Sequence, residues 1–429
     1  MKKIISSIFL ITHTLFSVAQ WDLVEGPLPY ATQFAGLDFI NDSTGFVSKT
    51  IINWTNYQTE ILMTLDYGET WNTVYTHTDS EDMWADRITN IFFIDPIHGW
   101  ACGEFQPYVL KTDDGGLTWI PHDIEGFVQN HYFEKIEFAD ENYGIAYGGT
   151  HAIESTDGGL TWAYRDSLNG YDIDFLSSCD FISVNGGNIK RVNDCVLAPY
   201  QPFPTSNEDP ERNGKCIHMI DENNWIMGTQ GLIGFSEFAS IIYTSDAGSN
   251  FQIFDLPFGD NVSLFEFSSP LEGYALVPNI DPVPCTVMKT IDGGQNWYCI
   301  ETPQSEEGWY LNFPYFDCPS PEVCYGIYGT SIYRTLNGGG EMHPLPTTVA
   351  EISSNEVAIS PNPAKDIVVV SSKIIIRELE VFNSYGQLML SEKINSTSVT
   401  LDLSTFSQGI YIVTFKSDVG ISNQRIVKD

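Results

Sequence analysis

Short apolar segments and polar turns alternate along most of the chain in an order that repeats. An apolar strand, a polar turn, then Gly and a second apolar strand recur at residues 91–101, 136–146 and 265–275. Turn signals at this spacing are typical of all-β proteins built from short strands. The pattern therefore predicts pairs of antiparallel strands joined by tight turns.

A short motif follows such strand pairs six times, about every 45 residues: Ser or Thr, any residue, Asp or Asn, any residue, and Gly. Its acidic or amide positions are Asp66, Asp114, Asp157, Asp246, Asp292 and Asn337. In five copies an aromatic residue stands three residues after the Gly, and Met342 takes that place in the sixth. An Asp or Asn side chain accepts hydrogen bonds from nearby backbone N–H groups, and Gly supplies a positive φ. Each copy is therefore predicted to be a hairpin turn, with the aromatic residue as an apolar anchor in the returning strand.

These aspartates could instead bind calcium or act as catalytic acids. A calcium loop needs several carboxylates at alternate positions, whereas most copies of the motif supply one. We therefore interpret the motif as a structural turn.

The spacing of the copies indicates how many repeats the chain contains. The step from Asp157 to Asp246 is 89 residues, about twice the others, so one copy is hidden. The best candidate is 192–194, which keeps Asp194 but lacks the Gly and the aromatic residue. Seven repeats of four short strands predict the blades of a β-propeller. Residues 21–24 resemble the strand after the first motif, so we expect them to complete the last blade and remove a free sheet edge.

These turns resemble the BNR or Asp-box repeats of sialidase-like and sortilin-like propellers. The repeat combines the strand pattern, a turn with Gly followed by an aromatic residue, and the box. This combination is most similar to photosystem II assembly and stability factor-like propellers. The resemblance covers residues 20–346 and implies one all-β, seven-bladed β-propeller.

The N-terminal residues have the composition of a secretory signal peptide. Lys2 and Lys3 precede an apolar run at 4–16, and a small-residue site ends at Ala19. We predict a signal peptide over residues 1–19. No other segment approaches the ~20 apolar residues that span a bilayer, so no transmembrane segment is expected.

The last 72 residues, 358–429, follow a polar linker at 347–357 and alternate β-forming residues with turns. This alternation predicts a small immunoglobulin-like antiparallel β-sandwich. It closely resembles the type A C-terminal sorting domain of the type IX secretion system, with Arg425 where Lys is more usual. The residues that carry the resemblance are Pro361, Asn362, Pro363, Gly386, Gly409, Tyr411 and Lys428.

The resemblance implies an export route and a partner, the type IX secretion machinery. The chain would cross the inner membrane, fold in the periplasm and cross the outer membrane. The sorting domain would then be removed, leaving the passenger released or attached to surface lipopolysaccharide. The alternative is an ordinary accessory sandwich, such as a carbohydrate-binding one, since fold alone does not distinguish the two.

Charge excludes some partners. The chain has 20 Lys and Arg against 56 Asp and Glu, and residues 20–357 carry 11 against 49, a net charge of −38. So acidic a surface argues against binding to nucleic acid or anionic lipid.

Eight cysteines in an exported chain predict disulfides. Cys195 and Cys216 bracket a Pro-rich insertion, Cys318 and Cys324 bracket a tight turn, and Cys285 and Cys299 flank one box. We predict these three pairs and leave Cys102 and Cys179 unassigned. No zinc-site spacing accompanies the cysteines.

Sialidases share the box turns and are therefore the first enzyme class to test. They need an arginine trio, a Tyr nucleophile with a Glu partner, and an Asp acid. The propeller region has five arginines, and none stands in the Arg-Ile-Pro setting of sialidases. Xyloglucanase-type enzymes use two propellers, whereas this chain has one. No nucleophile-elbow, zinc-protease or phosphate-loop motif occurs.

We therefore expect a non-catalytic exported propeller, without cofactor or metal, that binds a glycan or protein through loops at one rim. Its candidate contact residues are Trp54, Tyr57, Trp84, Tyr200, Phe203, Trp309 and Tyr310. The alternative is a secreted glycoside hydrolase of sialidase-like or xyloglucanase-like type, because sequence gives no distances between its carboxylates.

Overall fold

The computed structural model describes residues 21–26, 32–52, 57–79, 87–104, 108–126, 132–148, 151–165, 170–197, 201–202, 213–230, 239–256, 258–278, 285–303, 311–345, 357–383, 388–417 and 420–428. Every regular element in these ranges is a β-strand, and they contain no helix with the length and apolar character to cross a membrane. The chain divides into two compact units, Met1–Leu345 and Pro346–Asp429.

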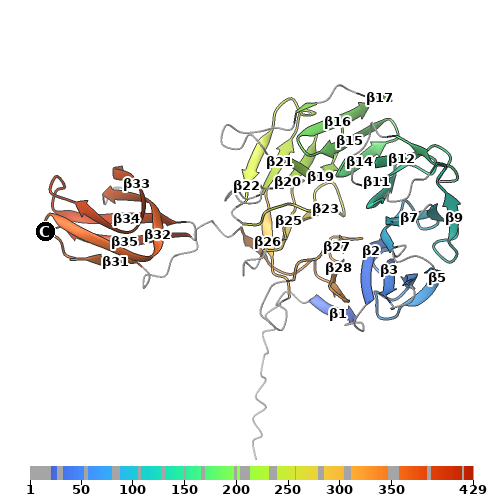
Figure 1. The fold of residues 1–429 in the computed structure, drawn as a ribbon, viewed down its shortest axis with the longest axis horizontal. Helices are drawn as coiled ribbons and strands as arrows, with labels where there is room; N and C mark the ends of the chain where they lie inside the picture. The colour runs from blue at the N-terminus through green and yellow to red at the C-terminus, as the bar shows by residue number, and fades with distance from the viewer. Residues whose placement is uncertain are drawn as a thin grey trace, which may run out of the picture. The chain divides into compact units, whose positions relative to one another are not determined.

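The first unit is a ring of seven antiparallel sheets (Figure 1), which confirms the predicted seven-bladed β-propeller. Blade 1 contains β2 (Thr32–Asn41), β3 (Thr44–Ile52), β4 (Tyr57–Thr64) and β5 (Asn72–Asp79). Blade 2 contains β6 (Arg87–Phe93), β7 (Gly99–Glu104), β8 (Tyr108–Thr112) and β9 (Ile120–Asp123). Blade 3 contains β10 (Lys135–Phe138), β11 (Gly144–Gly148), β12 (His151–Ser155) and β13 (Ala163–Tyr164).

The remaining blades follow the same order. Blade 4 contains β14 (Asp172–Ser177), β15 (Asp180–Asn185), β16 (Asn188–Asn193) and β17 (Val196–Leu197), with β18 (Gln201–Pro202) also pairing with β16. Blade 5 contains β19 (Asn213–Met219), β20 (Trp225–Gln230), β21 (Ser240–Thr244) and β22 (Gln252–Asp255). Blade 6 contains β23 (Leu264–Phe267), β24 (Gly273–Leu276), β25 (Val287–Thr290) and β26 (Tyr298–Ile300).

Blade 7 joins the two ends of the propeller. It contains β27 (Tyr315–Asp317), β28 (Cys324–Tyr328) and β29 (Ser331–Thr335), and its fourth strand is β1 (Trp21–Glu25). Trp21 pairs with Thr335 and Asp22 with Arg334, as expected from the sequence. Because β1 occupies the edge of β29, the strand after the last box, β30 (Met342–Pro344), pairs with β26 of blade 6 instead.

The apolar core lies between neighbouring blades. Phe39 of blade 1 stacks on Tyr325 of blade 7, and Phe138 of blade 3 stacks on Trp100 of blade 2, each with ring centroids 3.5 Å apart. The box residue Trp162 meets Phe138 edge-on at 5.8 Å. The aromatic residues after the other four boxes that carry one make similar ring contacts, which accounts for their periodic recurrence.

The second unit contains β31 (Val357–Ser360), β32 (Ile367–Asn383), β33 (Leu388–Asp402), β34 (Gly409–Ser417) and β35 (Gly420–Lys428). The first half of β32 pairs with β31 and the end of β33, whereas its second half pairs with β34 and the start of β33. The sheet therefore folds over one core in which Val368 and Leu401 join Leu379, Val413 and Phe415. The expected β-sandwich is present, and the long strands β32 and β33 each contribute to both of its layers.

Candidate functional site

Each box turn closes on itself through its own side chains. In the first, Asp66 Oδ1 accepts hydrogen bonds from the Thr64 hydroxyl (2.9 Å) and the Thr70 backbone N–H (2.8 Å), and Oδ2 accepts one from the Thr70 hydroxyl (2.7 Å). The Gly68 N–H donates to the Thr64 hydroxyl oxygen (2.9 Å). The same carboxylate bonds recur at Asp114 and Asp157, and at Asp246 and Asp292 the side-chain amides of Asn250 and Asn296 replace the hydroxyl as the donor to Oδ2.

The protonation of these carboxyls reflects their bonds. The side-chain hydrogen bond from the residue four positions later is the main cause that lowers the pKa of Asp66, Asp114 and Asp246. In the sixth box Asn337 Oδ1 accepts the Thr335 hydroxyl hydrogen bond at 2.7 Å. The box side chains are therefore employed in turn formation.

A backbone hydrogen bond joins each box turn to the first turn of its blade. The residue after the box Asp donates its N–H to a carbonyl oxygen there, as from Gly158 to Asn142 in blade 3 (2.8 Å). Blade 4 lacks a box, and a two-residue turn at Asp194 and Cys195, with φ of 50° and 61°, links β16 to β17. A disulfide joins Cys195 to Cys179 in the first turn of that blade.

The predicted Cys195–Cys216 disulfide is therefore wrong. Cys179 and Cys195 stand on neighbouring turns of one blade, with Cα atoms 4.2 Å apart. Cys216 is a buried thiol in β19, and its Sγ lies 3.2 Å from the carbonyl oxygen of Val262. The prediction paired the cysteines that bracket an insertion, whereas the strand register of blade 4 decides which turns meet.

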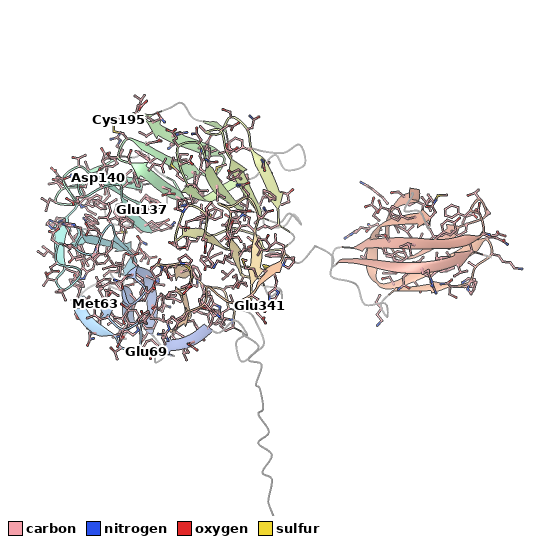
Figure 2. The ribbon with its side chains drawn as sticks, turned by 180° about the vertical axis from the view of Figure 1, so that it is seen from behind. Met63, Glu69, Glu137, Asp140, Cys195 and Glu341 are labelled. Carbon is pink, nitrogen blue, oxygen red and sulfur yellow. A yellow bond between two sulfur atoms is a disulfide. The ribbon has the colours of Figure 1, made fainter. Side chains whose placement is uncertain are left out.

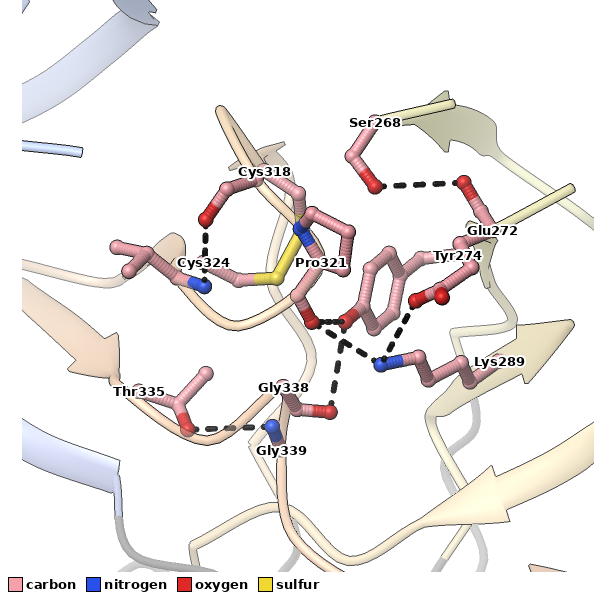
Figure 3. The surroundings of a disulfide bond; sticks show 12 residues. Ser268, Glu272, Tyr274, Lys289, Cys318, Pro321, Cys324, Thr335, Gly338 and Gly339 are labelled. Atoms are coloured by element: carbon pink, nitrogen blue, oxygen red, sulfur yellow. Dashed lines mark hydrogen bonds and ion pairs between the residues drawn. A yellow bond between two sulfur atoms is a disulfide. The ribbon is translucent and has the colours of Figure 1, made fainter. Parts of the chain in front are cut away.

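The predicted Cys285–Cys299 and Cys318–Cys324 disulfides are present. The second closes the turn between β27 and β28, as Figure 3 shows. In that turn the carbonyl oxygen of Pro321 accepts hydrogen bonds from Tyr274 Oη (2.9 Å) and Lys289 Nζ (3.1 Å) of blade 6. The disulfide-closed turn thereby ties blade 7 to blade 6. Cys102 is a second buried free thiol.

A cavity of about 380 Å³ is lined by the innermost strands of all seven blades, and we call it the axial channel. Seven equivalent positions line it, each near the end of its inner strand and paired with the second or third residue of the next strand of the blade. We call these the channel ring: Asp38, Phe92, Glu137, Asp174, His218, Glu266 and Asp317. Figure 2 shows Glu137 toward the centre of the propeller and Cys195 at its periphery. Five of the seven ring residues are acidic.

Several channel carboxylates accept hydrogen bonds from backbone N–H groups of the neighbouring blade. The Phe39 N–H donates to Asp317 Oδ2, the Phe93 N–H to Asp38 Oδ2 (2.6 Å), and the Met219 N–H to Asp174 Oδ2 (2.6 Å). Asp172 Oδ2 likewise accepts the Ile217 N–H (2.9 Å), while its Oδ1 meets Lys135 Nζ at 2.6 Å. These side chains satisfy backbone donors that no strand partner reaches, because the inner strand is the end of its sheet.

Four carboxyl groups of the channel ring have a raised pKa, and burial is the largest cause in each. It raises the pKa of Asp317 to about 7. The pKa values of Asp38 and Glu266 rise through burial and then through the charge of Asp317, and that of Glu137 rises through burial and then through Asp172. The carboxyl groups of the channel are therefore buried and close to one another, and both effects favour the protonated form at mildly acidic pH.

Sequence reasoning did not single out the channel ring, although a signal was present. An acidic residue directly before Phe at the end of an apolar strand occurs at Asp38, Glu137, Asp174 and Glu266. The proposed rim aromatics, Trp54, Trp84, Tyr200, Phe203, Trp309 and Tyr310, lie outside the described residues, as does the side chain of Tyr57. The channel is thus the candidate site that the described residues define.

In the second unit, the sorting-motif residues gather at the end of the last strand. Asn362 Nδ2 donates to the Arg425 carbonyl oxygen (2.6 Å), and Asn362 Oδ1 accepts the Val427 N–H (2.9 Å). Lys428 Nζ meets Asp366 Oδ1 at 3.0 Å. Pro361 and Pro363 flank Asn362, Gly409 and Tyr411 lie in β34, and Gly386 is outside the described residues. Asn362 thereby covers part of the free edge of β35.

The fold and the sorting-motif residues at the end of β35 define the class of protein: an Asp-box β-propeller followed by a C-terminal β-sandwich. Residues 358–429 match the family described as the secretion system C-terminal sorting domain, and residues 68–169 match photosynthesis system II assembly factor YCF48. The sorting domain supports export to a secreted or cell-surface location, and it implies the type IX secretion machinery as a partner. A comparison with curated proteins found no match.

Similar solved structures include three propeller proteins. YCF48 bound to a D1 peptide is 18% identical, with a TM-score of 0.50, 74% of this chain covered and 94% of that one. PorZ of Porphyromonas gingivalis, described as an essential surface component of the type IX secretion system, is 10% identical (TM-score 0.37, 92% and 74% covered). The GH74 enzyme of Niastella koreensis is 13% identical (TM-score 0.39, 91% and 58% covered). At such identities the YCF48 likeness is one of fold.

Proposed function

We propose that this protein is an exported, non-catalytic binding propeller. A signal peptide at 1–19 directs the chain across the inner membrane, and the domain at 358–429 directs it across the outer membrane. The propeller, residues 20–346, is the functional passenger. The sorting domain is removed after export at the linker, residues 347–357, and the propeller is released or attached to the cell surface.

The observation that carries the non-catalytic part of the proposal is the use of the carboxylates. Both oxygens of box residues such as Asp66 accept hydrogen bonds within the turn. Asp38, Asp174 and Asp317 in the channel each accept an N–H from the next blade. A glycosidase needs two carboxyl groups that face the substrate. Side chains that hold the scaffold are poor candidates for that role.

We propose a protein segment rich in Lys and Arg as the ligand. The net charge of −38 over residues 20–357 attracts cationic partners and repels acidic sugars. YCF48, the propeller of similar fold, is described with a bound peptide. We propose that the ligand binds at the rim opposite the box turns, because the candidate aromatic residues fall in sequence between strands whose described ends lie at that rim.

Binding and turnover assays on the mature chain test this proposal. We expect saturable binding to Lys- and Arg-rich peptides that weakens as salt is raised, because screening reduces the attraction. Matched Glu-rich peptides should not bind. Turnover of sialosides, xyloglucan or β-glucans would contradict the proposal.

The second candidate function is glycoside hydrolysis, and one observation favours it. Burial, then the charges of Asp317 and Asp38, raise the pKa of Glu266, as a general acid requires. Glu266→Gln tests this alternative: loss of a measured glycosidase activity in this variant, with the fold intact, would establish the hydrolase and overturn the binding proposal.

Deletion of 358–429 tests the export part separately. The truncated protein should accumulate in the periplasm of its host. Normal appearance outside the cell would refute the role of this domain in sorting.

A further inference from the structure

One of the three disulfides is open to solvent. Cys195 is exposed and Cys179 is half-buried, on the two turns that meet in blade 4. The four cysteines of the other two disulfides are buried: Cys285, Cys299, Cys318 and Cys324. Thiol–disulfide exchange requires an attacking thiolate to reach one of the two sulfur atoms. A reductant in solution can therefore reach the blade 4 disulfide, while the folded propeller shields the other two.

The turn that carries Cys195 has a backbone conformation that its second residue does not favour. It is a two-residue turn with a positive φ at both Asp194 (50°) and Cys195 (61°). Hairpin turns of this kind favour Asn, Asp or Gly at the first position and Gly at the second. At a positive φ the β carbon comes close to the following carbonyl oxygen, so Cys195 is strained where Gly is not. Release of this turn would relieve that strain.

The strand after this turn gains little from apolar burial. β17 pairs with β16 through two residue pairs, and its own side chains, Val196 and Leu197, are 65% and 41% exposed. In blades 2 and 3, by contrast, the box is followed by a buried tryptophan, Trp119 or Trp162. Burial of such a side chain anchors the outer strand to the core. Blade 4 has no such anchor after its turn, so the position of β17 depends on the disulfide.

The first turn of blade 4 is held by contacts of its own. Nη2 of Arg191, in β16, lies 3.2 Å from Oδ1 of Asp180, the residue after Cys179. The same nitrogen donates a hydrogen bond to the carbonyl oxygen of Glu222 in blade 5 at 2.9 Å. These contacts do not involve the disulfide and persist when it opens. Reduction should therefore leave Cys179 in place and free the turn of Cys195 together with β17.

We propose that the Cys179–Cys195 disulfide is a redox switch, which a dithiol reductant opens in the folded protein and which then releases β17 from the edge of blade 4. A thiolate of the reductant attacks Cys195 Sγ, the S–S bond breaks, and Cys179 leaves as a thiolate that takes up a proton. The second thiolate of the reductant then displaces Cys195 from the mixed disulfide, and Cys195 is protonated in turn. Two electrons pass from the dithiol, which becomes a disulfide, to the protein, which gains two thiols.

Reduction of the folded, unaltered mature chain by dithiothreitol tests the switch. Timed alkylation and peptide mass spectrometry follow each cysteine separately. We expect Cys179 and Cys195 to be labelled about tenfold or more faster than the cysteines of the other two disulfides, because a reductant reaches those only after the propeller opens. Amide hydrogen exchange should rise about tenfold or more across residues 193–197 on reduction. It should stay unchanged in the blade 3 box, residues 155–161.

Two variants separate loss of the disulfide from loss of the turn. Cys179→Ser with Cys195→Ser should show fast exchange across 193–197 without reductant. Cys179→Ser with Asp194→Asn and Cys195→Gly supplies the favoured Asn-Gly turn, so exchange should stay slow and should not respond to dithiothreitol. Equal rates of reduction for all three disulfides, or unchanged exchange across 193–197 after reduction, would overturn the proposal. Equally fast exchange in the two variants would overturn it as well, because β17 would then not depend on the turn.

Discussion

The backbone N–H of Cys195 donates a hydrogen bond to the carbonyl oxygen of Cys179 at 3.1 Å. The other six blades make the same bond between the box turn and the first turn, as from Gly115 to Ile97 and from Gly338 to Glu322. Blade 4 has no box, and its turn lacks the side-chain hydrogen bonds that a box supplies. In blade 4 the disulfide between these two residues holds the turn in place, as the hydrogen bonds of the box do in the other blades.

Removal of this disulfide should destabilise the propeller. Cys179→Ser with Cys195→Ser opens a loop with a sequence separation of 16, for which the chain-entropy model gives about 3 kcal/mol in the free energy of unfolding. Urea denaturation measures the loss. The unaltered chain, denatured without reductant, should titrate two thiols, those of Cys102 and Cys216. A Cys195–Cys216 cross-linked peptide in a digest would contradict the pairing.

The box carboxylates should matter for stability in proportion to their hydrogen bonds. Asp157→Ala removes the acceptor for the Ser155 hydroxyl and for the N–H and hydroxyl of Thr161. We expect a loss of about 1–3 kcal/mol in the free energy of unfolding. Asp157→Asn should cost less, because Asn337 fills this role in the sixth box. Equal losses from the two variants would count against the interpretation.

Ring closure should depend on Trp21. The residue is 9% exposed, and its ring centroid lies 5.1 Å from that of Phe313. Trp21→Ala should lower the free energy of unfolding by about 3–5 kcal/mol, the usual cost of truncating a buried tryptophan. Leu23→Ala is the matched control, since Leu23 is 50% exposed on the same strand. If both variants melt at the same temperature, β1 does not close the propeller in solution.

Stability should fall as the pH rises from about 5 to about 8. Burial raises the pKa of Asp317 to about 7, so the folded state binds its proton more tightly than the unfolded chain does. The stabilisation is complete below the unfolded pKa and is lost as the pH rises through the folded one. Burial also raises the pKa values of Asp38, Glu137 and Glu266, which act in the same direction.

Melting temperatures across this pH range measure the effect. Asp317→Asn keeps an acceptor for the Phe39 N–H and removes the titrating group, so its melting temperature should fall less with rising pH. Asp123→Asn, at an exposed position of β9, should behave like the unaltered protein. A protein that becomes more stable between these pH values would show that the channel carboxyls are not protonated in the folded state.

The sequence predicted the turns well because their chemistry is local. The hydrogen bonds of the first box all lie between Thr64 and Thr70, so the order of residues alone specifies the turn. Their recurrence gave the number of blades, including blade 4, where Asp194 remains in a hairpin. The unpaired strand at Trp21 predicted closure for the same reason, since a propeller leaves one edge to be filled.

The cysteine partners and the channel ring required the tertiary structure. Cys179 meets Cys195 because the register of β14 to β17 places two turns side by side, which proximity along the chain does not reveal. Asp317 accepts the N–H of Phe39, 278 positions earlier, only once the ring closes. Local hydrogen bonds decided the repeat in this protein, while blade packing decided which distant charges and thiols share a site.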